Sequence, residues 1–153
     1  MEAFVNLFGP VDAVLGASAI GGTFVIEYVL MALVLVNFVT RHRAHSAHKS
    51  QYEEGGAEAI SRYPAHVAAN VALILTSFYY LTLHHHGGMV MSTLVLGLFL
   101  SDFFEFEARK VEARREIELE RPKGAIVASL LVLAYAAFQS LFWVIKGPWS
   151  AIV

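Results

Sequence analysis

Two acidic residues, Glu27 and Asp102, lie within or at the end of long apolar runs of this 153-residue chain. A carboxylate in a membrane helix costs at least ~2.5–3.5 kcal/mol at the bilayer centre unless it is neutral, paired or in contact with water. Counting back from Arg41, at the end of the first run, places Glu27 ~9 Å below the outer surface. Glu27 could bind a proton or a cation. Alternatively, it could lie near a helix end and be protonated or reach the headgroups.

Lys146 stands apart from the other basic residues, at the end of the fourth apolar run. It follows Lys123 by ~34 Å of helix, which places it at the same membrane surface as Glu27. A Lys stem can bend along a helix while its ammonium group reaches a polar partner. We therefore predict an ion pair between Glu27 and Lys146. Together with Asp102, these residues are the candidate ion or proton site.

One face of the run 65–83 carries polar side chains at steps of four, seven, three and four, a spacing that aligns residues on a helix. They are His66, Asn70, Ser77, Tyr80 and His84, with Leu73 filling the gap. This face could be a polar track across a membrane. It could also make hydrogen bonds between helices, typically worth ~0.6 kcal/mol each. We favour the second interpretation.

Three histidines, His42, His45 and His48, are spaced three apart, as in some metal sites. On a helix this spacing fans the rings over ~120°, whereas a spacing of four converges better on one ion. They are therefore weak candidates for a metal site, and we favour interfacial residues that add positive charge when protonated. The adjacent histidines 84–86 point in different directions. The sequence contains no Cys, so thiolate metal sites are excluded. We predict no metal and no cofactor.

Four apolar runs must position these residues, roughly 17–40, 65–83, 89–104 and 125–145. Every Lys and Arg except Lys146 lies in the first or third gap between them. The first gap holds Arg41, Arg43, Lys49 and Arg62, and the third holds Arg109, Lys110, Arg114, Arg115, Arg121 and Lys123. Basic loops stay on the cytoplasmic side of a membrane. We therefore expect both termini and the turn 84–88 outside.

The composition agrees with a membrane location, because 57% of the residues are hydrophobic and only 16% are charged. Soluble domains are nearer ~45–50% apolar. We predict one all-α domain over residues 1–153, an integral four-helix bundle N-out and C-out with spans near 20–40, 65–83, 89–104 and 125–145. Its location would be the cell membrane, as a multi-pass protein. The basic residues of the third gap alternate with Glu, so no nucleic-acid partner is expected.

Glycine and proline residues indicate where the helices should begin and end. The first helix can continue past the membrane to Gly55-Gly56, and the second begins at Tyr63-Pro64, since proline suits the first helical turn. We predict that the third helix runs without a break over 89–120 into the cytoplasm. Residues 3–16, broken by Gly9-Pro10, are either a separate interfacial segment or an extension of the first helix.

Small and aromatic residues suggest where the helices pack. Thr93, Gly97 and Ser101 form one small-residue ridge, and Ala125 with Ser129 begins another, both expected to be packing seams. Phe103, Phe104 and Phe106 would form an aromatic belt at the inner surface. The charged segment 105–121 would be a solvated helix or a docking site for a cytoplasmic partner.

The whole layout, with four apolar runs, no Cys and more Arg than Lys, resembles small uncharacterised four-helix membrane proteins of halophilic archaea. The resemblance covers the chain as a whole and implies the membrane bundle already described. It contains no diagnostic motif, so it assigns no functional residue.

No catalytic motif is present, so we expect a non-enzymatic protein. The first hypothesis is an accessory or scaffold subunit of a membrane complex, in contact with the lipid bilayer and with a larger membrane-protein partner or further copies of itself. The second is a small proton- or cation-coupled transporter that uses Glu27 and the polar face of the second helix. The third is a metal-binding membrane enzyme or sensor.

Overall fold

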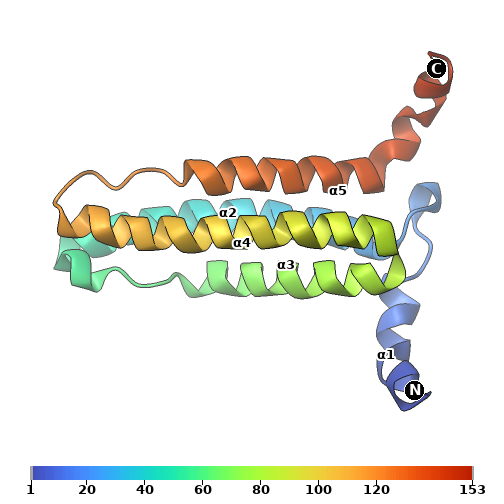
Figure 1. Ribbon diagram of the computed structural model, residues 1–153, viewed down its shortest axis with the longest axis horizontal. Helices are drawn as coiled ribbons and strands as arrows, with labels where there is room; N and C mark the ends of the chain where they lie inside the picture. The colour runs from blue at the N-terminus through green and yellow to red at the C-terminus, as the bar shows by residue number, and fades with distance from the viewer. Residues whose placement is uncertain (1, 153) are drawn as a thin grey trace.

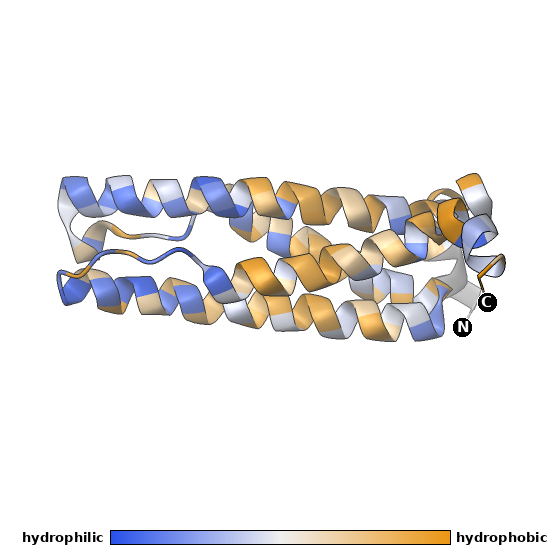
Figure 2. Ribbon diagram, turned by 90° about the horizontal axis from the view of Figure 1, so that it is seen from above, coloured by the Kyte–Doolittle hydropathy of each residue, from blue (hydrophilic) through white to orange (hydrophobic). Residues whose placement is uncertain are grey.

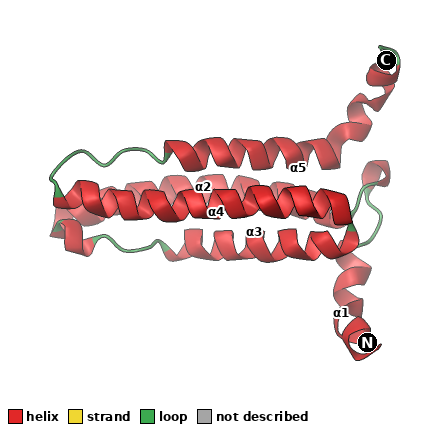
Figure 3. Ribbon diagram, viewed as in Figure 1, coloured by secondary structure: helices red, strands yellow, loops and turns green. Residues whose placement is uncertain are grey.

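The structure is a computed structural model that describes residues 2–152, and it is all α-helical, as predicted. Four long antiparallel helices form the bundle: α2 (Val25–Gly55), α3 (Pro64–Leu83), α4 (His85–Arg114) and α5 (Lys123–Ser150). Each contacts its two neighbours in the ring α2–α3–α4–α5 (Figure 1). All four are long and apolar enough to cross a membrane. The connections between them are loops and short turns (Figure 3).

The bundle has an apolar half and a polar half (Figure 2). The 20 residues of α3 span ~30 Å, whereas α2 and α4, with 31 and 30 residues, extend ~15 Å further. The core of the apolar half contains Ile26, Leu30, Val34, Leu73, Tyr80, Met91, Val95, Leu98, Ala125, Val132 and Ala136. Large apolar side chains on all four helices also point outward, among them Val36, Leu75, Leu100 and Leu131.

In the polar half only α2 and α4 continue as helices. The connections 56–63, which contains the 3₁₀ turn η2 (Ala57–Ala59), and 115–122 fold back along them toward α3 and α5 (Figure 1). A second small core of Ile60, Phe106, Ala113 and Leu119, with Tyr52 of α2 packed against it, joins these four segments. The expected solvated helix is therefore a packed one. Phe106 is only 7% exposed, so it cannot contribute to the predicted aromatic belt, whereas Phe103 and Phe104 are exposed.

The prediction of one helix over 89–120 is correct across the end of the apolar half but wrong at its C-terminus, because α4 ends at Arg114. Glu116 adopts the left-handed conformation with φ 56°. The N–H of Ile117 reaches the carbonyl of Glu112, and that of Glu116 reaches Ala113, which is the Schellman pattern. A non-glycine residue in this conformation costs ~1–2 kcal/mol. Burial of Leu119 in the second core, ~1.5–3 kcal/mol, offsets that cost.

The N-terminal segment is a separate helix, α1 (Glu2–Leu15), steeply inclined to the bundle (Figure 1). It runs through Gly9-Pro10, so the expected break there is wrong. The 3₁₀ turn η1 (Ile20–Gly22) separates it from α2. Gly21 has φ 77°, and a Cβ there would lie 2.2 Å from the ring of Trp143, so only glycine fits. Of the two interpretations of residues 3–16, the structure supports a segment distinct from the first long helix.

The turn between α3 and α4 is shorter than predicted. His84 alone separates the two helices, and the rest of 84–88 forms the first turn of α4. The Nδ1 atom of His84 accepts a hydrogen bond from the N–H of Gly87 at 2.9 Å and caps that helix. Both termini lie at this end of the bundle, and the two long connections lie at the other (Figure 1).

Candidate functional site

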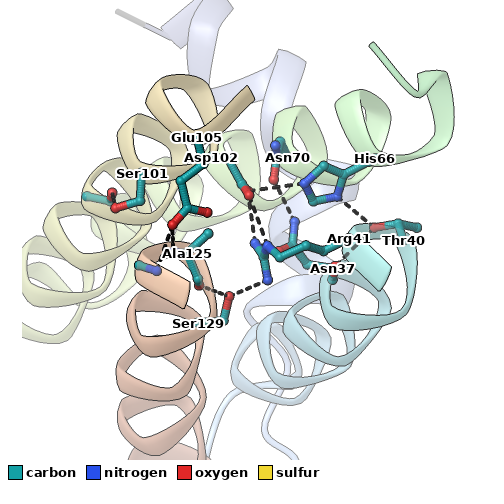
Figure 4. Close-up of polar contacts among 12 residues, drawn as sticks. Asn37, Thr40, Arg41, His66, Asn70, Ser101, Asp102, Glu105, Ala125 and Ser129 are labelled. Atoms are coloured by element: carbon teal, nitrogen blue, oxygen red, sulfur yellow. Dashed lines mark hydrogen bonds and ion pairs between the residues drawn. The ribbon is translucent and has the colours of Figure 1, made fainter. Parts of the chain in front are cut away.

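A bidentate ion pair between Arg41 of α2 and Asp102 of α4 lies where the apolar half meets the polar half (Figure 4). The Nε atom of Arg41 donates to Oδ1 of Asp102 at 2.9 Å, and Nη2 donates to Oδ2 at 2.8 Å. The side chains are only 3% and 9% exposed. Such paired N–H···O bonds give both strength and fixed geometry. The sequence marked both residues as membrane boundaries but did not predict that they pair.

Two further polar side chains contact the Arg41 guanidinium, and a third extends the cluster. Nη2 also donates to the side-chain Oδ1 of Asn37 at 2.5 Å, and Nη1 donates to the Ser129 hydroxyl of α5. The amide of Asn37 in turn donates to Asn70 of α3 at 2.6 Å. The Ser129 hydroxyl donates its own hydrogen bond to the backbone carbonyl of Ala125 at 2.6 Å. All four long helices therefore meet at one arginine.

His66 of α3 bridges the carboxylate to α2. Its Nε2 lies 3.2 Å from Oδ2 of Asp102, and its Nδ1 lies 3.0 Å from the hydroxyl of Thr40. An Nε2–H group suits the carboxylate, which only accepts. If the Thr40 hydroxyl donates to Nδ1, the ring is neutral. If it donates instead to the carbonyl of Asn37, 3.1 Å away, the ring can hold a second proton. In both arrangements His66 joins α3 to α2 and α4.

The chemistry of this cluster, which we call the Arg41 network, is that of a clamp. Both oxygens of Asp102 and four N–H groups of Arg41 have partners within the chain. Removing one member of a buried pair usually costs 3–5 kcal/mol, because the other charge is left uncompensated. Asp102 accepts all of these bonds from side chains of two other helices, so the network is arranged to hold helices together.

Glu105, one turn after Asp102, caps α5. Its Oε1 accepts from the N–H of Gly124 at 2.6 Å and from that of Ala125 at 3.2 Å (Figure 4). These N–H groups have no partner within the helix, and the helix dipole favours an anion there. Burial raises the pKa of Glu105, and the two N–H donors oppose that rise. The cap fixes the start of α5 beside the Arg41 network.

Glu27 lies at the other end of the apolar half, in the first turn of α2. Its Oε1 accepts from the Tyr80 hydroxyl at 2.6 Å, and its Oε2 accepts from the N–H of Phe24 at 3.0 Å. The side chain is 5% exposed and Tyr80 is fully buried. A carboxylate in a first turn is stabilised by free N–H groups and by the helix dipole. Of the two interpretations of Glu27, the structure supports the residue near a helix end.

The predicted ion pair of Glu27 with Lys146 is wrong. Lys146 is exposed and makes no ion pair among residues 2–152. The C-terminal part of α5 turns away from the bundle (Figure 1), and neutral donors satisfy Glu27 instead. Asp102, the third member of the candidate ion site, belongs to the Arg41 network. The three residues are therefore not brought together.

The predicted polar face of α3 faces the bundle but is not continuous. His66 and Asn70 join the Arg41 network, and Tyr80 joins Glu27. Ser77, between these sites, donates to the carbonyl of Ile74 in its own helix. His84 is exposed and caps α4. The contacts are those of the favoured interpretation, hydrogen bonds between helices.

His42, His45 and His48 differ in their surroundings, and the expected positive charge is wrong for two of them. His45 is 9% exposed and His48 is 2% exposed. Burial, then the Arg109 charge, lowers the pKa of each to about 4, so both are neutral near pH 7. Nδ1 of His48 lies 3.0 Å from Nη1 of Arg109 and accepts from it. Within residues 2–152, no three His, Cys, Asp or Glu side chains gather in a way that could hold a metal ion.

The two predicted small-residue ridges differ in burial. Ala125 and Ser129 are fully buried at the contact of α5 with α2 and α4, so that seam is confirmed. Thr93 and Gly97 are exposed, and a Cβ at Gly97 would meet no atom within 4 Å. The α4 ridge is therefore not a packing seam within this chain.

Comparison with known proteins gives a family but no activity. Residues 2–153 match a domain of unknown function, DUF7313. The chain belongs to the DUF7313 family. No curated protein and no solved structure matches it. The assignment of a role to this DUF7313 chain therefore depends on its own residues.

Proposed function

We propose that this chain is a multi-pass protein of the cell membrane with both termini outside. Its four long helices have the length and hydropathy of membrane spans. The outward apolar side chains form the kind of surface that lipid or protein must cover. The basic residues gather in and near the polar half, which by the positive-inside rule is cytoplasmic.

Single cysteines test this orientation, because the chain has no native Cys. The cysteines are placed at exposed positions, so that burial within the bundle does not prevent their reaction. A cysteine at Ser50 or Arg115 should be protected from an impermeant thiol reagent in intact cells, whereas one at His86 should react. The opposite pattern would reverse the orientation.

We further propose a non-catalytic role, as an accessory or scaffold subunit of a membrane complex. The observation that carries this proposal is an apolar layer between the two polar sites. Glu27 with Tyr80 lies on one side, and the Arg41 network lies on the other. The layer consists of side chains that are 0–1% exposed: Leu30, Val34, Leu73, Val95, Leu98 and Val132. It supports a rigid bundle rather than a path for ions.

The exposed ridge of α4 suggests how a partner would be held. Small residues let helices approach closely in a membrane, where packing rather than the hydrophobic effect drives association. Gly97 has open space around it. The partner would be a helix of a larger membrane protein or of a second copy.

Purification of the tagged chain from native membranes tests the role. We expect a stoichiometric partner that is lost with Gly97→Leu and kept with Ala32→Leu, which adds the same side chain on an exposed face of α2. A chain that purifies alone, as a monomer, would contradict the proposal.

A transporter is the competing function, and flux in liposomes separates the two. The cavity beside Asp102 has a volume of about 40 Å³, space for little more than one water molecule, and its lining ends at Asn70 and Phe99. We expect no proton or cation flux above that of empty liposomes. A flux that Glu27→Gln abolishes would replace the accessory role with transport.

A further inference from the structure

A basic pocket lies beside the Arg41 network, between α2 and the segment that leads into α5. Its volume is about 400 Å³, within the ~300–1,000 Å³ range of ligand sites. The pocket is basic toward the polar half and apolar toward the apolar half. Arg41, His42, Lys49 and Arg121 supply the basic part, and Phe38 and Ile126 supply the apolar part.

The charges at the rim are not neutralised within the pocket. Lys49 and Arg121 are exposed, and neither forms an ion pair among residues 2–152. No carboxylate lines the described pocket. Asp102 pairs with Arg41 behind the pocket, and three further acidic groups line an adjacent groove that shares Lys49 and Arg121: Glu112, Glu118 and Glu120. Of these, Glu120 pairs with Lys123, and Glu112 accepts the N–H of Glu120.

His45 in the wall of the pocket is a second, independent sign of a missing ligand. Its side chain is 9% exposed, and both ring nitrogens are buried without a hydrogen-bond partner. Buried polar groups in native proteins nearly always have partners. The neighbouring groups that lower the pKa of His45 by their charge are Arg109 from α4, Lys49 and His42 from α2, and Arg121 from the connection. An anion in the pocket would give these groups what they lack.

We propose that this pocket binds the phosphate of an anionic phospholipid at the cytoplasmic surface. The inference rests on the proposed membrane location. The occupant is argued from the two-part lining: Lys49, Arg121 and His45 suit a phosphate, while Phe38 and Ile126 suit the start of acyl chains. The pocket also lies where the apolar half ends, which is the level of the headgroups.

Protonation of His45 follows from this occupant. A nearby anion favours the protonated ring, which then donates to the phosphate. A phosphodiester lipid does not titrate near neutral pH. The pKa of His45 is about 4 before an anion binds, so binding should strengthen as the pH falls from about 6.5 toward 4.

Lipid titration of the full chain in neutral detergent, followed by native mass spectrometry, tests the proposal. Phosphatidylglycerol should bind in preference to phosphatidylcholine. Lys49→Gln with Arg121→Gln should weaken that binding by on the order of fivefold per removed charge. The matched control is Arg43→Gln with Arg115→Gln, which removes two exposed charges of the polar half outside the pocket and should have little effect. His45→Leu should remove the pH dependence, and melting curves check that each variant is folded.

Three outcomes would overturn the proposal. They are no preference for phosphatidylglycerol, an equal loss in the pocket and control variants, and displacement of the lipid by millimolar inorganic phosphate, which would mean a site for a free anion. These outcomes do not bear on the accessory role, because partner capture is measured separately. Failure of membrane insertion would appear in the thiol-labelling experiment instead.

Discussion

Asp102 and Glu27 are two acidic side chains at opposite ends of the same apolar core, and they are held in different ways. Glu27 lies in the first turn of α2, where the N–H of Phe24 is free to reach it, and a tyrosine supplies the second donor. Asp102 lies in the interior of α4, where backbone N–H groups are already used, so its donors must be side chains. Arg41 and His66 provide them.

The difference shows that position within a helix decides which partner a carboxylate needs. A first-turn carboxylate can be satisfied by neutral donors and by the helix dipole. A mid-helix carboxylate in an apolar setting needs a cation or a proton. The Asp102 end should therefore be the more sensitive to mutation, and the variants below test that order.

The largest effect is expected at the Arg41 network. Asp102→Leu leaves the Arg41 guanidinium buried without its counter-ion, and we expect a loss of ~3–5 kcal/mol in the free energy of unfolding. Arg41→Met with Asp102→Leu should recover much of that loss, because neither charge remains. Reversible unfolding in detergent micelles measures both. A double variant as unstable as the single one would show that the charges are not coupled.

A smaller effect is expected at the Glu27 end. Tyr80→Phe removes the hydroxyl that donates to Glu27, and the loss of a buried hydrogen-bond donor should cost ~1–3 kcal/mol in unfolding free energy. Lys146→Met should change stability by no more than ~0.5 kcal/mol, since Lys146 is exposed and unpaired in the described chain. If Lys146→Met proved the more damaging variant, Glu27 would need a cation after all.

The polar half should show a pH dependence that comes from its two buried histidines. The folded pKa values of His45 and His48, about 4, lie below the ordinary value of 6.5, so the unfolded chain binds more protons between these limits. Stability is therefore complete above pH 6.5 and falls as the pH drops toward 4. We expect a loss on the order of 2 kcal/mol for each histidine from pH 7 to 5 in zwitterionic detergent, since a full pKa unit is worth about 1.4 kcal/mol.

His45→Leu separates burial from simple surface charge in this pH dependence. Because both nitrogens of His45 lack partners, the apolar side chain should fit and reduce the slope of stability against pH. His86→Leu, at an exposed position at the opposite end of the bundle, is the control and should leave the slope unchanged. Equal slopes in all three proteins would place the titration elsewhere.

The helices of the apolar half could be predicted because the length of each apolar run, its hydropathy and the glycine and proline residues at its ends all indicate the same helix. Pro64 begins α3, and Gly56, with φ 72°, directly follows the end of α2 at Gly55, as their backbone preferences require. The path of the two connections could not be predicted. Ile60 and Leu119 are the buried apolar residues of two largely polar segments, and only the surface of α2 and α4 gives them a place to pack.

At the candidate site, the sequence likewise could not predict which side chains from different helices would meet. Counting residues gives the depth of a group along a helix, and it placed Arg41 and Asp102 at one membrane surface. Depth does not say which helices face each other, so their pairing was missed. The same count put Glu27 and Lys146 at the other surface, where α5 turns away from the bundle (Figure 1).

The smallest effect is expected at Glu116, where the polar half departs most from its predicted helix. Glu116→Gly should raise the free energy of unfolding by ~0.5–1 kcal/mol, because glycine adopts φ 56° without the strain of a side chain. The extra freedom of glycine in the unfolded chain keeps the gain small. Glu116→Ala is the matched control, since it removes the same charge but keeps a Cβ, and it should not stabilise. If alanine stabilised as much as glycine, charge rather than backbone conformation would explain the gain. The Schellman end of α4 would then not be the feature that turns the connection 115–122 back and lets Leu119 pack.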